Sequence, residues 1–167
     1  MTFLPIRRFP DPILKQPTHR VLRLSDEAQH LIDAMVQTMR HHPRCVGLAA
    51  PQVGSNLRIA VMDASAHPKA AASHGLLVLV NPEITATEGT VIQREGCLSI
   101  PDFTANVGRA ARVRLKTFDQ YGSSYEMHLE GFEAIVAQHE VDHLDGRLFL
   151  DRVANLKTDV FKRKTYL

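Results

Sequence analysis

The five residues His139-Glu140-Val141-Asp142-His143 constrain this chain more than any other part of its sequence. On a helix, two histidines at this spacing lie one turn apart, so both imidazoles point the same way and can bind one metal ion. Glu140 lies beside that ion, where its carboxylate can take a proton from water. The pattern therefore predicts a metal-binding helix that activates water. The alternative is a chance match on a solvated helix, because the chain contains nine histidines.

The composition is that of a globular protein. The chain has 167 residues, of which 44% are hydrophobic and 23% charged, and a chain of this size buries about two thirds of the surface that its unfolded form exposes. We therefore expect a single domain over residues 1–167 that needs no disulfide or metal merely to hold its core. The net charge is only +2, so DNA is not an expected partner. We expect a monomer.

A short basic tail at about residues 153–167 is the one local excess of positive charge. It is either a solvated helix end or a contact with RNA, such as that of the ribosome. The basic residues of the tail are Lys157, Lys162, Arg163 and Lys164.

Residues 1–12 contain two arginines and three prolines and no continuous apolar core, so they do not form a secretion signal. No segment is apolar over the length of a bilayer, and we expect a cytoplasmic protein without a membrane partner.

Hydrophobic periodicity predicts two helices. Ser25 supplies an N-cap before an acidic first turn, and apolar residues recur at helical spacing from about Asp26 to His41. A second helix is expected from about Gly131 to Leu144, with Gly146 placed to end it. Its apolar stripe continues into the two motif histidines, so the metal ion should lie inside the protein. The stripe consists of Phe132, Ile135, Val136, His139 and His143.

Between these helices the period changes to that of strands. Apolar runs at residues 58–63 and 76–80 predict two buried strands, and Asn81-Pro82 is expected to stop the second. Residues 64–75 are rich in alanine, serine and histidine, which favours a surface loop.

Farther along, residues 112–117 and 125–129 alternate between apolar and polar side chains on either side of a turn, which predicts a hairpin. The elements together predict an α+β fold. In this fold, antiparallel or mixed β-sheets pack around a central metal-binding helix, with a further helix near the N-terminus.

The third ligand of the metal is not in the helix motif. A catalytic zinc-like site takes three protein ligands and leaves one position open, whereas a structural site adds a fourth. A metzincin peptidase would have its third histidine where this chain has Phe149, and a thermolysin-like peptidase would use a later glutamate, but none follows His143. Both peptidase interpretations are weakened. Cys97 remains, since a thiolate is a strong ligand for zinc or ferrous iron, although most free cysteines are simply buried core residues.

Three motifs occur in this order along the chain: Cys45–Gln52, Glu95–Ser99 and Gln138–His143. They resemble the Gly-x-Gly-Leu-Ala-Ala-x-Gln, Glu-Gly-Cys-Leu-Ser and Gln-His-Glu-x-Asp-His motifs of the peptide deformylase family. Residues 10–14 and 58–63 are also similar to the family. The resemblance implies a metal-dependent hydrolase that removes the N-formyl group from the N-terminal formyl-methionine of nascent polypeptides and releases formate.

The resemblance also assigns roles to residues. It implies that Glu140 is the general acid and base that acts on metal-bound water. The side-chain amide of Gln52 and the backbone N–H of Leu98 would stabilise the oxyanion. The native metal would be Fe²⁺, and Zn²⁺, Ni²⁺ or Co²⁺ could replace it in isolated protein. The implied metal ligands are Cys97, His139 and His143.

The expected partner is a nascent formyl-methionyl polypeptide, whose methionine side chain needs an apolar slot beside the metal. Several of the matching positions would be core residues whatever the function. Beyond methionine, the peptide is expected to lie as an added strand along residues 45–47 and 102–106. The positions that match the methionine slot are Cys45, Val46, Gly47, Leu98, Phe132, Ile135 and Val136.

Two carboxylates have expected structural roles. Asp142 would orient a ligand histidine or tie the helix to a sheet, and Glu95 would pair with a basic residue such as Arg109. The chain departs from the family at Thr104, where many members carry arginine, and at Gly108, where proline is usual, which leaves substrate affinity open.

Cys45 is the sharpest departure, because the family has glycine there. Its side chain would narrow the pocket, or reach the metal and close a four-ligand site with Cys97, His139 and His143. Such a closed site would make the protein a non-catalytic metal-binding module. A disulfide between Cys45 and Cys97 under oxidation is a further hypothesis. A small metallopeptidase of another type also remains an alternative at this point.

Overall fold

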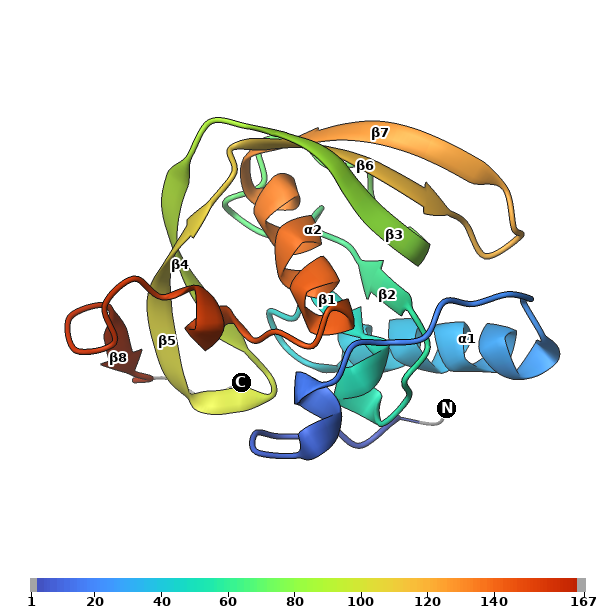
Figure 1. The fold of residues 1–167 in the computed structure, drawn as a ribbon, viewed down its shortest axis with the longest axis horizontal. Helices are drawn as coiled ribbons and strands as arrows, with labels where there is room; N and C mark the ends of the chain where they lie inside the picture. The colour runs from blue at the N-terminus through green and yellow to red at the C-terminus, as the bar shows by residue number, and fades with distance from the viewer. Residues whose placement is uncertain (1–2, 165–167) are drawn as a thin grey trace.

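Helix α2 runs through the middle of the molecule, and strands of two sheets surround it (Figure 1). The computed structural model describes residues 3–164. In chain order its elements are η1 (Pro12–Lys15), α1 (Asp26–His41), β1 (Gly47–Ala49), η2 (Ala50–Val53), β2 (Ile59–Met62), β3 (Leu77–Glu88), β4 (Val91–Cys97), β5 (Ile100–Arg109), β6 (Arg112–Phe118), β7 (Ser124–Glu130), α2 (Gly131–Leu144), η3 (Phe149–Arg152) and β8 (Val160–Lys162).

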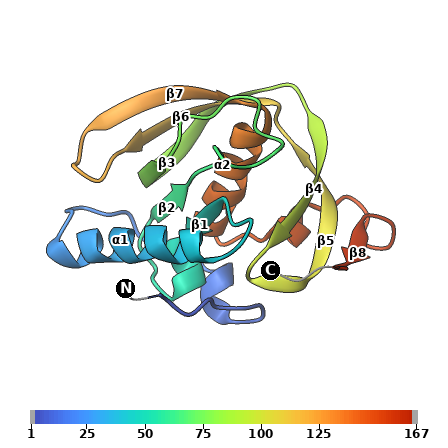
Figure 2. The same ribbon diagram turned by 180° about the vertical axis from the view of Figure 1, so that it is seen from behind.

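The strands of the described residues form one five-stranded and one three-stranded sheet, in the orders β1-β2-β3-β6-β7 and β4-β5-β8. Neighbouring strands pair antiparallel in both sheets. The expected α+β class is confirmed, and the sheets are antiparallel. Seen from behind, β4 and β5 cross beside one end of α2 while β3, β6 and β7 arch over it (Figure 2).

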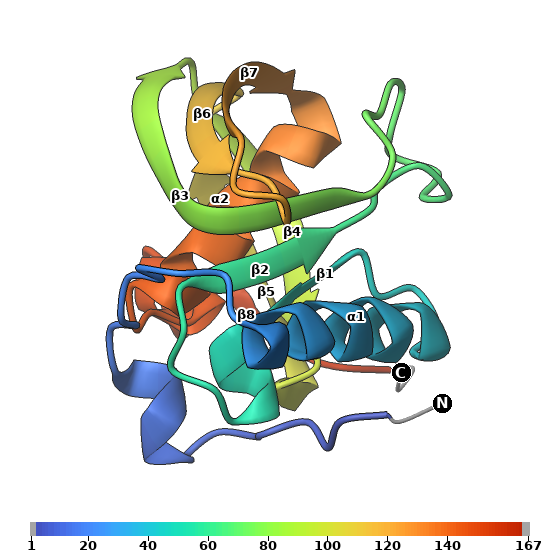
Figure 3. The same cartoon turned by 90° about the vertical axis from the view of Figure 1, so that its right-hand side faces the viewer.

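Helix α1 has the predicted bounds. Its N-cap is Ser25, whose Oγ accepts a hydrogen bond from the backbone N–H of Ala28 at 3.3 Å. The helix buries an apolar face against β1 and β2, on the side of these strands away from α2 (Figure 3). Leu31 and Val36, which the periodicity placed in the stripe, lie half-buried at its margin. The fully covered face consists of Ala28, Ile32, Met35, Thr38 and Met39.

Strand β3 does not stop at Asn81-Pro82, so that expectation is wrong. The strand continues to Glu88, and its register with β6 shifts between Val80 and Glu83. Such a bulge tolerates proline, which has no N–H for the ladder. Asn81 has a positive φ of 53°, and its side-chain amide both donates to and accepts from the backbone of Val21 at 2.8 Å. Side-chain hydrogen bonds therefore replace the ladder at this point.

The predicted hairpin is confirmed as β6 and β7, and the predicted loop at residues 64–75 lies between β2 and β3. The sequence did not reveal β4, β5 and β8. The basic tail is not a helix end, because residues 160–162 form β8 and pair with residues 103–105 of β5. That pairing occupies the edge of β5, so the expectation that a substrate strand adds along residues 102–106 is also wrong.

Helix α2 is buried on most of its surface, and not along one stripe alone. One face packs against the five-stranded sheet. The other faces β4 and β5, whose own core includes Cys97 together with residues of η1 and η3. Gly146, two residues after the helix, has a φ of +76° and is the predicted stop signal.

Gly146→Ala should destabilise the protein more than Gly75→Ala does. Both glycines have a left-handed backbone, with φ of +76° and +73°, which costs an alanine roughly 1–2 kcal/mol. A Cβ at Gly75 would meet nothing within 4 Å, whereas one at Gly146 would lie 2.8 Å from the carbonyl carbon of Gln16. We expect Gly146→Ala to cost about 1–3 kcal/mol more, since overpacking has that magnitude. Urea unfolding of metal-loaded protein measures the difference, and equal losses would contradict this account.

Candidate metal centre and active site

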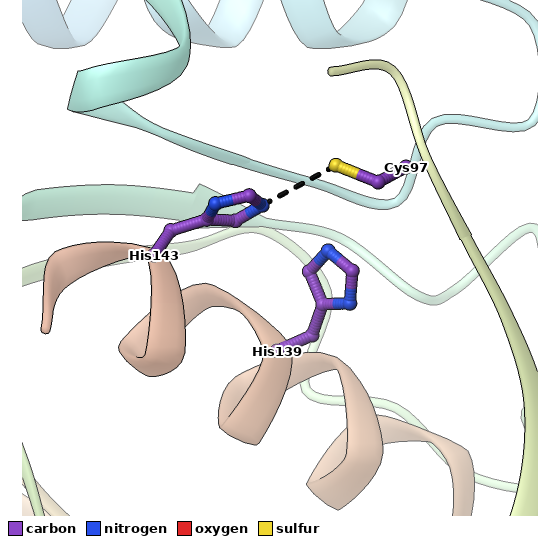
Figure 4. Close-up of side chains that lie close together, drawn as sticks. All are labelled: Cys97, His139 and His143. Atoms are coloured by element: carbon purple, nitrogen blue, oxygen red, sulfur yellow. Dashed lines mark hydrogen bonds between the residues drawn. The ribbon is translucent and has the colours of Figure 1, made fainter. Parts of the chain in front are cut away.

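Cys97, His139 and His143 bring three ligand atoms together. Cys97 ends β4, and the two histidines lie one turn apart on α2 (Figure 4). One ligand atom from each residue lies within 4.8 Å of the other two, and Cys97 Sγ is 3.4 Å from His143 Nε2. A thiolate with two imidazoles is a donor set for zinc or ferrous iron. The residues predicted to bind the metal therefore meet in space.

The surroundings of this cluster orient His139 and stabilise the charge of Cys97. His139 Nδ1 forms a 2.8 Å hydrogen bond with Oε1 of Glu95, which leaves Nε2 to face the cluster. Burial alone would raise the pKa of the Cys97 thiol, but His143 and His139 outweigh it and hold that pKa well below its ordinary value. The environment therefore favours the thiolate, the form that binds metals.

A buried arginine links the two walls of the site. Arg109, at the end of β5, donates from Nε and Nη2 to the carboxylate of Glu95 at 2.7 and 2.9 Å, and from Nη1 to Asp142 at 2.6 Å. Burial alone would raise the pKa of Glu95, but the hydrogen bonds from Arg109 and His139 lower it to about 2. The expected Glu95–Arg109 pair is confirmed. Asp142 ties α2 to the sheet through Arg109 and to η3 through Arg152.

Glu140 lies next to the cluster with one oxygen unsatisfied. The residue is buried, and Oε2 has no hydrogen-bond partner among the described residues. Burial raises the pKa of this carboxyl, while His139 and His143 act in the opposite direction. A Cβ on Gly47 would lie 2.8 Å from the carboxyl carbon of Glu140. Glycine at this place in β1 therefore makes room for the carboxylate.

Gln52 points its amide nitrogen at the cluster. Its Oε1 accepts a 3.0 Å hydrogen bond from the backbone N–H of Ala49, which fixes the orientation of the amide. Its Nε2 then lies 3.3 Å from Cys97 Sγ and 3.2 Å from Ser99 Oγ. Leu98 follows Cys97 in the turn between β4 and β5 and lines the same cavity. Gln52 and Leu98, the residues predicted to stabilise the oxyanion, therefore both lie next to the predicted metal ligands.

A cavity of about 220 Å³ opens in front of these groups. All the positions predicted for the methionine slot line it, although their contact with substrate stays a prediction. The loop at residues 64–75 also lines the cavity, which was not predicted. His67 of this loop stacks on Phe132 with ring centroids 4.2 Å apart. Other lining residues that the sequence did not reveal are Arg44, Lys69, Gln93, Arg94 and Arg163.

Cys45 does not complete a four-ligand site. Its sulfur is not part of the three-atom cluster and lies 3.2 Å from the carbonyl oxygen of Gly47, to which the thiol donates. Burial, followed by the charge of Glu140, raises the pKa of Cys45 to about 12, so the thiol stays neutral. The closed site proposed as an alternative is therefore wrong for this structure. Cys45 and Cys97 are both free, and the oxidation hypothesis stays a prediction.

Arg109→Leu should destabilise the protein far more than Arg152→Leu. Both arginines bind Asp142, but the Arg109 side chain is 3% exposed and that of Arg152 is 41% exposed. Removing Arg109 leaves two buried carboxylates without their shared cation, which costs about 3–5 kcal/mol. Loss of an exposed partner costs about 1 kcal/mol or less. Denaturant unfolding of the metal-loaded variants measures both changes, and similar losses would show that Arg109 is not the principal link.

The comparisons with known proteins agree with this geometry. The family model for polypeptide deformylase matches residues 3–159. A peptide deformylase of Thermodesulfovibrio yellowstonii is 41% identical over 98% of this chain and 97% of its own length. A crystal structure of a peptide deformylase from Legionella pneumophila has a TM-score of 0.85 at 38% identity, covering 93% of this chain and 89% of that one.

A further solved relative is a class I type b peptide deformylase from Acinetobacter baumannii with Met-Ala-Ser bound. It has a TM-score of 0.84 at 35% identity and covers 91% of this chain and 99% of its own. The agreement thus extends over sequence, fold and the metal-binding cluster. This chain belongs to the polypeptide deformylase family, the hydrolases that remove formyl groups.

Proposed function

We propose that Cys97, His139 and His143 bind one divalent cation, and that Glu140, Gln52 and Leu98 act beside it in hydrolysing the N-formyl group of formyl-methionyl polypeptides. The observation that carries this proposal is the meeting of three ligand atoms within 4.8 Å beside a buried carboxylate that has an unsatisfied oxygen. A purely structural centre has no use for such a carboxylate. The reaction releases formate and leaves a free amino group on methionine.

Ferrous iron is the native metal in this proposal, and zinc, nickel or cobalt are substitutes in isolated protein. The donor set fits all of them, since one thiolate and two imidazoles suit the later divalent first-row metals. When bound, the ion supplies Lewis acidity, which polarises a carbonyl oxygen and lowers the pKa of water toward about 7. The Glu95 carboxylate holds His139 in the tautomer that presents Nε2 to the ion.

Glu140 moves the proton. Its unsatisfied Oε2 accepts the proton that the attacking water loses, and the same carboxyl then delivers it to the departing amine. Burial raises the pKa of this carboxyl, and Cys97 and Glu95 act in the same direction. Its pKa is therefore closer to neutral pH than that of an exposed glutamate. Gly47 lets the carboxylate lie close to β1, where the substrate is expected.

Gln52 and Leu98 stabilise the negative oxygen of the tetrahedral intermediate. The Gln52 amide is already oriented by Ala49, so its N–H groups need no reorganisation when charge develops. The backbone N–H of Leu98 supplies the second donor in the same turn as Cys97. Loss of one such donor typically lowers the rate by about 10²- to 10³-fold.

The substrate backbone lies between two free strand edges. β1 ends the five-stranded sheet and β4 ends the three-stranded sheet, and residues of both line the cavity. An extended peptide can hydrogen-bond to such edges without sequence preference. The methionine side chain then enters the apolar part of the cavity at Phe132, Ile135 and Val136. The A. baumannii relative was solved with Met-Ala-Ser bound, which supports a peptide as the ligand.

Several broader features belong to the same proposal. The chain acts as a monomeric, single-domain enzyme in the cytoplasm, on nascent chains. In residues 3–164, the structure contains no helix that is both long and apolar enough to cross a membrane. The exposed Lys157 and Lys164 of the tail are the proposed contact with the ribosome.

Glu140→Gln should abolish most formate release without removing the metal. The substitution keeps the size of the side chain but removes the proton acceptor, and we expect a loss of roughly 10²- to 10⁴-fold in kcat/KM on formyl-Met-Ala. Glu133→Gln is the matched control, because Glu133 is also buried on α2 but binds Ser73 and His74 and does not line this cavity. Its activity should stay within about threefold, as expected for a residue outside the chemistry.

Formate release and bound metal are measured on the same samples. Full activity of Glu140→Gln with normal metal content would remove Glu140 from the mechanism. Cleavage of the peptide bond in unformylated Met-Ala peptides, without formate release from the formylated ones, would indicate a metallopeptidase.

A further inference from the structure

The C-terminal strand carries an arginine into the wall of the cavity. Arg163 directly follows β8, and its backbone N–H donates to the carbonyl oxygen of Asp102 in β5 at 2.8 Å. Its side chain reaches β4, where a Cβ on Gly96 would lie 3.1 Å from the guanidinium carbon. The guanidinium therefore packs on the bare backbone of Gly96, next to the metal ligand Cys97, and lines the same cavity.

The donor groups of Arg163 are unsatisfied. Its Nε and Nη2 are both buried and have no hydrogen-bond partner in the described part of the chain. These two nitrogens form one fork of a guanidinium and match the two oxygens of a carboxylate. Arg109 uses the same two nitrogens to hold Glu95. The fork of Arg109 is thus paired with a carboxylate of the protein, whereas that of Arg163 has no acceptor among the described residues.

Buried charged donors without an acceptor are costly, so this arrangement favours any ligand that supplies one. The cavity has an excess of positive charge, because four cationic side chains of the described residues line it: Arg44, Lys69, Arg94 and Arg163. Two carboxylates oppose them. Glu95 is already engaged by Arg109 and His139, and Glu140 lies at the inner end beside the metal ligands. A carboxylate on the substrate would supply the acceptor that these side chains do not.

The fold holds this arginine in place. Residues 160–162 pair with β5, and Phe161 lies under the guanidinium of Arg94 at 3.7 Å from the ring centroid. Arg94 is itself oriented by a 3.0 Å hydrogen bond to Asn106. β8 is therefore fixed across the sheet, which places the side chain of Arg163 beside Gly96 in the wall of the cavity.

We propose that Arg163 is a specificity-determining residue that binds a carboxylate side chain of the substrate peptide, so that formyl-methionyl peptides with aspartate or glutamate soon after methionine are preferred. This inference rests on the proposed deformylase function and names the substrate class of that site. Formyl-methionine itself carries no charge that the fork can bind. The carboxylate must lie in the following residues, which pass Gly96 when the peptide adds to the β4 edge.

The test uses C-terminally amidated formyl-Met peptides of four residues, with glutamate or glutamine at the second, third or fourth position. Amidation removes the terminal carboxylate, and the same peptides with a free C-terminus show whether that group binds instead. Metal-loaded wild-type protein should have a kcat/KM about tenfold higher for glutamate than for glutamine at one or more positions, mainly through KM, as expected for one charge-assisted bidentate contact.

Arg163→Gln should reduce this ratio to about one, and Arg163→Lys should keep part of it, since lysine retains the charge but not the fork. Lys162→Gln is the matched control. It removes one positive charge from the adjacent, exposed residue of the same strand and should leave both the activity and the ratio unchanged.

The outcomes separate the two proposals. No formate from any peptide with wild-type protein would defeat the proposed function itself. Normal formate release with a ratio near one at every position, or a ratio that Arg163→Gln does not change, would overturn only the role of Arg163. A preference that appears solely for free C-termini would also overturn it. An equal rise of all rates in Arg163→Gln would mean that Arg163 covers the cavity and does not select substrates.

Discussion

The site depends on one buried cation. Arg109 holds Glu95 of β4 and Asp142 of α2 at hydrogen-bond distance, and all three side chains are almost completely excluded from water. Without this link, the polar contacts left between β4 and α2 would be those within the site itself, from Glu95 to His139 and from Cys97 to His143. Because Glu95 is two residues from Cys97 and Asp142 is next to His143, the same ion pairs set the thiolate opposite the imidazoles. A charged network at this depth contributes specificity of arrangement more than net stability.

Three polar side chains at the centre, those of His139, Gln52 and Glu140, are each held by the protein and still have an atom available to a ligand. Glu95 fixes His139 through Nδ1, and Ala49 fixes the amide of Gln52 through Oε1. Glu140 is confined by the absence of a side chain at Gly47 and keeps a free oxygen. A buried polar group that is only partly hydrogen-bonded is costly in a core, and such groups are expected at functional sites. The open sides converge on the three ligand atoms, which is the arrangement a hydrolase needs.

The sequence predicted those parts of the fold that have a strong period or a local motif. Helix α1, the β6-β7 hairpin and the two histidines on α2 follow from spacing alone, and Cys97 followed from motif resemblance. The β4-β5 hairpin was not predicted because residues 91–96 are mostly exposed or polar and show no clear alternation. β8 has only three residues and exists through its pairing with β5. Consequently the approach of Arg163 to Gly96, between segments far apart in sequence, had no local signal.

The two cysteines of the cavity, Cys45 and Cys97, have opposite environments. Cys45 is close enough to share the cavity, yet its thiol donates to the carbonyl oxygen of Gly47, and burial keeps it protonated. A neutral thiol held in this way is a poor ligand, because metals bind the thiolate. Cys97 has the opposite environment, with two imidazoles that stabilise its charge. Geometry and proton affinity thus both set Cys45 apart from the three proposed ligands, which agrees with the open coordination position that the proposed hydrolysis requires.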